Sequence, residues 1–167
     1  MTTTTTPPAT STAPQWLRDL AAARTRYEEL VGWPVTVEVQ PRRLTVPVGE
    51  VLDALTMPAP LGHAVQSELR LMMLAGPVIA GPGHDWWTFL TEPTDASRPE
   101  VPAELHRWKL RPTPRGAHVI LPALATTEDK TPQWIGSPRS HTALPPWHAV
   151  IGATRRALSH LDSGTNP

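Results

Sequence analysis

The chain of 167 residues contains no cysteine, so it can form neither a disulfide, nor a thiolate nucleophile, nor a zinc or iron–sulfur site built on cysteine. No apolar run approaches the roughly 20 residues that a helix needs to span a bilayer. The first residues also lack the basic start and the apolar stretch of a secretory signal. We therefore expect a soluble cytoplasmic protein that is not associated with a membrane.

Charged residues are scarce, at 18% of the chain, and the formal net charge is zero. Only 2 of the 15 basic residues are lysines, an arginine bias typical of genes with high GC content. Residues 1–100 hold 7 basic and 11 acidic side chains, whereas residues 101–167 hold 8 and 4. This asymmetry fits either a basic face for phosphates or a solvated surface that pairs with the acidic half.

Proline is abundant, with 21 residues, and most of them fall between periodic segments, where they indicate loops and strand boundaries. After Met1, residues 1–13 contain only Thr, Pro, Ser and Ala, a composition that predicts a disordered tail. The hydrophobic content of 40% is enough for a core. The chain therefore predicts one domain over residues 14–162, with a flexible end at 163–167.

The spacing of apolar residues predicts both helices and strands. Helical spacing occurs at 15–31, where Pro14 and Gly32 suit the two ends, at 61–75, and in the last segment up to Leu161. Alternating or short apolar runs predict strands at 35–39, 44–48, 77–81, 86–91, 105–111, 117–122 and 133–135. Segment 49–57 could be strand or helix, and the prolines that follow it favour a strand. The expected fold is α+β, with a mixed or antiparallel sheet of about six to seven short strands and about three packed helices.

One turn stands out as a candidate site, in the segment GPGHDWWTFL at residues 81–90. His84 lies beside Asp85 at a Gly-Pro-Gly turn, whereas the seven histidines of the chain show neither HxH nor HExxH spacing. The glycines lack the pattern of a phosphate-binding loop and are better explained by a hairpin turn that needs positive φ. No metal site and no cofactor is expected from these patterns.

Tryptophans make up 7 of the 9 aromatic residues. Because neighbouring residues of a strand point to opposite faces, at most one of Trp86 and Trp87 belongs to the core behind that strand. The other is expected in a groove, beneath a helix or at a partner surface, where an indole can act as a stacking platform for bases.

The order of these segments resembles the N-terminal domain of bifunctional DNA primase/polymerases, in the archaeo-eukaryotic primase superfamily. That family has a strand ending in Asp-x-Asp, a helix, a Gly-rich turn with a histidine before an aromatic strand, and later a carboxylate strand and Trp- and Pro-containing segments. The corresponding stretches are VLDAL (51–55), the helix 61–75, GPGHDWWTFL (81–90), RGAHVILPA (115–123), QWI (133–135) and ALPPW (143–147). With a small gap, the resemblance matches His84 to a nucleotide-binding histidine.

The departures from this family pattern bear on activity. Asp53 matches the first metal carboxylate, but Leu55 stands at the second, and LHRWKLR (105–111) holds no later carboxylate. We therefore expect a non-catalytic, primase/polymerase-like binding or regulatory module with a degenerate active site and a protein partner. Its groove is expected to hold Asp53, His84, Asp85 and Trp86 or Trp87, with Arg107, Lys109, Arg111 and Arg115 on a neighbouring strand pair.

Two alternatives remain. The first is a nucleotide- or nucleic-acid-binding accessory protein in the replication of a plasmid or integrated element. Arg107, Lys109 and Arg111 alternate along one predicted strand, so they are expected on one side, where they could meet successive phosphates of a single strand. The second is an active metal-dependent nucleotidyltransferase whose metal ligands come from elsewhere in the chain.

Overall fold

The computed structural model describes residues 13–95, 98–123, 131–140 and 143–163, and these form an α+β fold. The elements in chain order are α1 (Gln15–Val31), β1 (Thr36–Glu38), β2 (Arg43–Pro47), β3 (Asp53–Pro58), α2 (Ala59–Leu71), β4 (Val78–Ala80), β5 (Trp86–Thr91), the 3-10 helix η1 (Ala103–Trp108), β6 (Arg111–Pro112), β7 (His118–Leu121), β8 (Gln133–Gly136) and α3 (Trp147–Ser163). Apart from Ala13, the predicted disordered tail lies outside these residues, as do 164–167 of the predicted flexible end. No helix within the described ranges is long and apolar enough to cross a membrane.

The strands form two sheets, not the one that the sequence predicts. The smaller sheet has the order β1-β2-β7 and the larger the order β6-β3-β5-β4-β8, and every described pair is antiparallel. Strands that follow one another in the chain pair as β1–β2 and β4–β5, and the second pair is the hairpin predicted at the Gly-Pro-Gly turn. Segment 49–57, which could be read as strand or helix, supplies β3 at the middle of the larger sheet.

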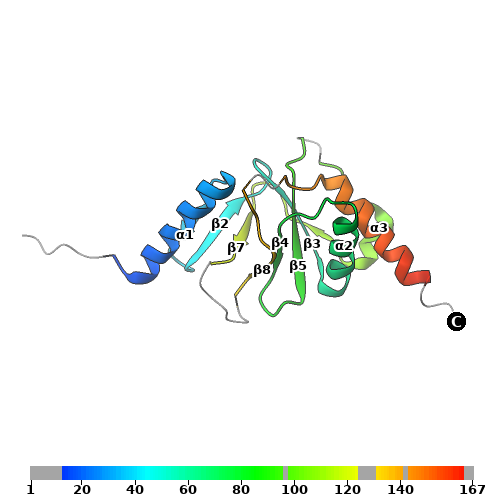
Figure 1. Ribbon diagram of the computed structural model, residues 1–167, viewed down its shortest axis with the longest axis horizontal. Helices are drawn as coiled ribbons and strands as arrows, with labels where there is room; N and C mark the ends of the chain where they lie inside the picture. The colour runs from blue at the N-terminus through cyan, green and yellow to red at the C-terminus, as the bar shows by residue number, and fades with distance from the viewer. Residues whose placement is uncertain (1–12, 96–97, 124–130, 141–142, 164–167) are drawn as a thin grey trace, which may run out of the picture.

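Helices cover the two sheets from opposite sides (Figure 1). On one face of the larger sheet, α2 and α3 pack against each other, and their apolar side chains join Leu55, Met57, Trp87 and Phe89 in a first core. The other face packs through Ala54, Ile79 and Leu90 against the smaller sheet and α1 in a second core. The larger sheet is thus the central layer.

The ends of α1 follow from its sequence. Leu20, Ala23 and Tyr27 share the buried face, as the helical spacing predicts. Gly32 adopts φ 70° and donates its backbone N–H to the carbonyl of Glu28, which ends the helix in the left-handed conformation that glycine adopts without steric cost.

The predicted strand over 105–111 is wrong. Residues 103–108 form η1, Lys109 takes φ 59°, and only Arg111 and Pro112 pair with β3. Leu105 and Trp108 lie three residues apart, and the three-residue repeat of a 3-10 helix turns both toward the first core. The predicted strand pair does not form either, because β7 pairs with β2 in the smaller sheet.

Candidate functional site

The structure does not assemble the predicted groove. Asp53 begins β3 and pairs with Thr91 of β5, whereas Trp86 lies at the other end of β5, opposite Pro58. The two positions are five residue steps apart along the strand, or about 17 Å at the usual rise of roughly 3.4 Å per residue. Asp53 and the turn that carries His84 therefore belong to different ends of the sheet.

Asp53 is fully buried and its carboxylate is held by three neighbours. One oxygen accepts hydrogen bonds from the backbone N–H and the hydroxyl of Thr94, at 2.8 and 2.7 Å. The other accepts from Arg98 at 3.1 Å, and the same Arg98 nitrogen donates to the carbonyl of Thr113. Arg115 lies 3.8 Å from the carboxylate and donates to Thr94. The carboxylate thus ties the loops after β5 and β6 to the sheet.

This arrangement brings two predicted site residues, Asp53 and Arg115, together as an ion pair. Arg115 was expected to face a ligand, but it pairs with Asp53. Leu55, which stands at the position of the family's second carboxylate, shares the face of β3 with Asp53 and is fully buried in the first core. That face of β3 packs against α2, so it presents no open surface to a substrate.

The turn between β4 and β5 has an unusual backbone. Gly83 has φ 78° and His84 has φ 61°, and only the glycine adopts this region without cost. The His84 N–H donates to Gly81 O at 2.9 Å, and Gly81 N–H donates to Trp86 O at 2.8 Å. Nε2 of His84 is buried and finds no hydrogen-bond partner among the described residues. Asp85 is exposed, and its backbone carbonyl accepts from Ala59 N–H, which connects the turn to α2.

Trp86 and Trp87 face opposite sides of β5, as the alternation predicts. Trp87 is buried in the first core, where its ring lies 6.1 Å from that of His63. Trp86 is half-buried on the other face, and the guanidinium of Arg111 lies 4.7 Å from the centre of its ring. Of the two, Trp86 is the residue that a ligand could reach.

The face of the larger sheet that carries Trp86 is only partly covered. Ala54 and Leu90, paired across β3 and β5, are fully buried in the second core. Two residues further along the same face, Thr56 and Thr88 are half-buried, and their hydroxyls hydrogen-bond to each other at 2.8 Å. On β3 and β5 this face is therefore less completely covered toward Trp86, whereas Ile79, which pairs with Thr88 on β4, stays buried in the second core.

The less covered part of this face forms a compact polar and aromatic surface. Arg111 pairs with Thr56, Thr56 with Thr88, and Trp86 lies two residues before Thr88, so all four side chains share one face. We call Thr56, Trp86, Thr88 and Arg111 the platform. Thr56 and Thr88 carry no distinctive sequence signal, because isolated threonines in strands are common.

Two further basic residues, Arg107 and Lys109, lie close in sequence to Arg111 of the platform. Arg107 stacks over Trp108, with 5.4 Å between the guanidinium and the ring centre, and Lys109 is exposed. Within the part of the chain that the structure describes, neither residue nor Arg111 makes an ion pair. The sequence predicts that Arg107, Lys109 and Arg111 alternate along one strand. In the structure they do not, because η1 and the left-handed Lys109 interrupt the strand.

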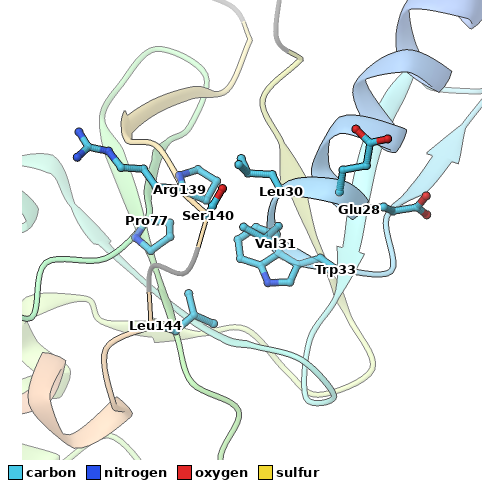
Figure 2. Close-up of a pocket in the computed structure, with 11 residues that line it drawn as sticks. Glu28, Leu30, Val31, Trp33, Pro77, Arg139, Ser140 and Leu144 are labelled. Atoms are coloured by element: carbon cyan, nitrogen blue, oxygen red, sulfur yellow. The ribbon is translucent and has the colours of Figure 1, made fainter.

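A pocket of about 450 Å³ lies elsewhere, between the end of α1 and the segment after β8 (Figure 2). Trp33, Leu30 and Leu144 contribute apolar walls, and Figure 2 shows the Arg139 guanidinium directed away from Trp33. None of the predicted site residues lines it. Its walls combine both charge signs with apolar surface and define no recognisable chemistry, so the platform, with its oriented groups, is the stronger candidate.

No protein-family model, curated protein or solved structure matches this chain. Nor does any cluster of three or more His, Cys, Asp or Glu side chains suited to a metal ion occur among the residues with described positions. Function is therefore inferred from the geometry of the platform and of Asp53.

Proposed function

We propose that this chain is a non-catalytic binding module that holds single-stranded nucleic acid on the platform. The observation that carries the proposal is the stacked pair of Trp86 and Arg111 on the less covered part of a sheet face. Indole and guanidinium planes both stack on bases, and such stacking tolerates any sequence because every base has a π-face.

The surroundings of the stacked pair suit a charged strand. Arg111, Arg107 and Lys109 lie within five residues of one another and carry charge that no described acidic side chain neutralises. Cations of this kind neutralise phosphates and release counterions. The hydroxyls of Thr56 and Thr88 supply further donors and acceptors beside Trp86.

The role of Asp53 supports binding without turnover. Two-metal phosphoryl transfer needs ions about 3.5–4 Å apart, held by several carboxylates. Both carboxylate oxygens of Asp53 accept hydrogen bonds from protein donors. Leu55, on the same face of β3, has an apolar side chain buried in the first core and cannot bind a metal ion. In this proposal the chain is a primase/polymerase-like domain with a degenerate active site, acting as an accessory protein in DNA replication.

The test is fluorescence anisotropy of a labelled oligo(dT) titrated with the protein at several salt concentrations. The parent should bind, and replacing Trp86 and Arg111 together by alanine should weaken binding at least about tenfold, since each stacked base contributes roughly 1–3 kcal/mol. Replacing Arg107 and Lys109 by alanine should make the slope of the logarithm of the binding constant against the logarithm of the salt concentration shallower, by about 0.7 for each phosphate that is no longer neutralised.

The matched control is Arg24→Ala, which removes an exposed arginine of α1 that pairs with Glu28. This variant should bind like the parent. Absence of binding by the parent at low salt, or equal affinity of the Trp86 and Arg111 variant, would remove the platform from consideration.

A further inference from the structure

The Gly-Pro-Gly turn before β5 contains two glycines with different backbone conformations. Gly83 has φ 78°, a value that glycine adopts without steric cost, so the turn itself requires it. Gly81 lies outside this left-handed region. Its N–H donates to Trp86 O, and its carbonyl accepts from the N–H of His84. The backbone therefore does not require a glycine at position 81.

Packing does not require a glycine there either. Among the described residues, a Cβ atom built on Gly81 would have one neighbour within 4 Å, the backbone carbonyl oxygen of Trp86 at 3.5 Å. Gly62 of α2 is the opposite case, because a Cβ atom there would lie 3.0 Å from the Trp87 side chain on the core face of β5. Position 81 thus has room for a side chain and carries none.

This position lies on the same face of the sheet as the platform. Ile79 of β4 pairs with Thr88 of β5. Gly81 follows Ile79 by two residues and Trp86 precedes Thr88 by two, so all four share one face and Gly81 lies opposite Trp86. The hydrogen bond from Gly81 N–H to Trp86 O, at 2.8 Å, agrees with this alignment. Gly81 is partly exposed, so its backbone is in contact with solvent.

The strand order places Arg111 and Gly81 on different sides of Trp86. In the order β6-β3-β5-β4, Arg111 of β6 lies two strands to one side of β5, whereas Gly81, which continues β4, lies next to β5 on the other side. The guanidinium of Arg111 lies over one face of the indole, so a base that stacks directly on Trp86 has to use the other face. No side-chain atom of Trp86 lies within 4 Å of the Cβ position of Gly81, so the indole leaves that position uncovered.

We propose that one unpaired base of the bound strand lies on the backbone at Gly81 and stacks against the face of Trp86 that Arg111 leaves free. This inference rests on the proposed function and adds the position of the base to it. A glycine in a strand often marks a site where a ligand comes close to the backbone. Because the N–H and the carbonyl of Gly81 are already hydrogen-bonded, the contact is stacking and van der Waals packing, which any base can make.

The test measures binding of labelled oligo(dT) to the full chain by fluorescence anisotropy, with larger side chains at position 81. Gly81→Val should weaken binding about fivefold or more, the loss expected for one stacked base, and Gly81→Ala should lie between this variant and the parent. Gly81→Ala should also melt no lower than the parent, because position 81 has an ordinary φ and room for a Cβ atom. Its loss of affinity therefore cannot come from unfolding. Gly152→Ala, on α3, is the matched control and should bind like the parent.

A second measurement locates the base directly. In the complex of isotope-labelled protein with unlabelled oligo(dT), nuclear Overhauser contacts should connect thymine methyl groups with the Hα protons of Gly81. A parent that does not bind, or that binds equally after Trp86 and Arg111 are replaced, overturns the proposed function and this inference with it. If binding depends on Trp86 and Arg111, then unchanged affinity of Gly81→Val, or the lack of an Overhauser contact at Gly81, overturns this inference alone.

Discussion

At the scale of single residues, Asp53 shows how a carboxylate at a suggestive sequence position can be structural. Breaking a buried pair leaves the partner charge unpaired, which typically costs about 3–5 kcal/mol. Asp53→Ala should therefore lower the free energy of unfolding by about that amount, because Arg98, whose side chain is only 15% exposed, loses its partner.

Urea denaturation gives this value, with Asp53→Asn as the matched comparison. The asparagine retains an oxygen for the hydrogen bonds from Thr94 but loses the charge, so its stability should lie between that of the parent and that of Asp53→Ala. Unchanged stability in both variants would mean that the carboxylate is available for another role.

Tyr27 is the only tyrosine of the chain, so its ionisation can be followed directly. Its hydroxyl donates to Pro122 O at 2.7 Å and accepts from Trp134 Nε1 at 2.8 Å. Burial raises the pKa of Tyr27 above its ordinary value of 10.0, and the hydrogen bond from Trp134 opposes that shift. The unfolded chain therefore releases this proton at lower pH than the folded chain.

The consequence is a loss of stability in alkali. The contribution of Tyr27 is fully present below about pH 10 and is lost as pH rises toward the folded-state pKa. The ultraviolet absorbance of tyrosinate should show a raised midpoint in the folded protein and an ordinary one in urea. Tyr27→Phe should lack this alkaline loss, and an ordinary midpoint in the folded state would contradict the burial of the hydroxyl.

At the scale of elements, the last helix closes the first core. Ile151 and Val150 are buried in that core beside Trp147, as the helical spacing predicts, whereas Leu161 near the helix end is 50% exposed. Ile151→Ala should cost on the order of 2–5 kcal/mol, since it leaves a cavity in packed surroundings. Thermal unfolding measures this, with exposed His148→Ala as the control. Equal melting of the two variants would show that α3 is not packed as described.

The sequence predicts the regular elements well because their signals are local. The helical spacing of α1 reflects burial on one face, so residues alone reveal it. The alternation of Leu44 and Val46 in β2 likewise marks side chains of the second core, although Thr45 between them is buried as well. The sequence fails at residues 105–111 because a three-residue repeat and an alternation look alike over so short a stretch. The division into two sheets depends on long-range pairing, which no local pattern encodes.

The candidate site was less predictable for the same reason. Trp86 and Arg111 are recognisable as types of residue, but their stacking depends on the pairing of β3 with both β5 and β6. The partners of Asp53 were missed because Thr94 and Arg98 lie in an acidic, proline-rich loop without periodicity. Only the structure shows that both carboxylate oxygens of Asp53 already accept hydrogen bonds from Thr94 and Arg98.

At the scale of the whole molecule, we predict that the chain does not polymerise nucleotides. A primer-extension and de novo priming assay with Mg²⁺ and with Mn²⁺ should give no product. The reason is that Asp53 is held by Thr94 and Arg98 and has no second carboxylate beside it. Metal-dependent product from the parent that disappears in a folded Asp53→Asn variant would instead establish an enzyme.

The most direct test of nucleic-acid binding on the platform is to locate the bound strand by nuclear magnetic resonance. Amide spectra of the isotope-labelled protein are recorded while unlabelled oligo(dT) is added. We predict that the amides of Thr56, Thr88 and Arg111 and the indole N–H of Trp86 shift progressively, while the indole of Trp33, distant from the platform, does not move. No shifts at saturating oligonucleotide, or shifts confined to α1 and the pocket beside Trp33, would contradict the proposal.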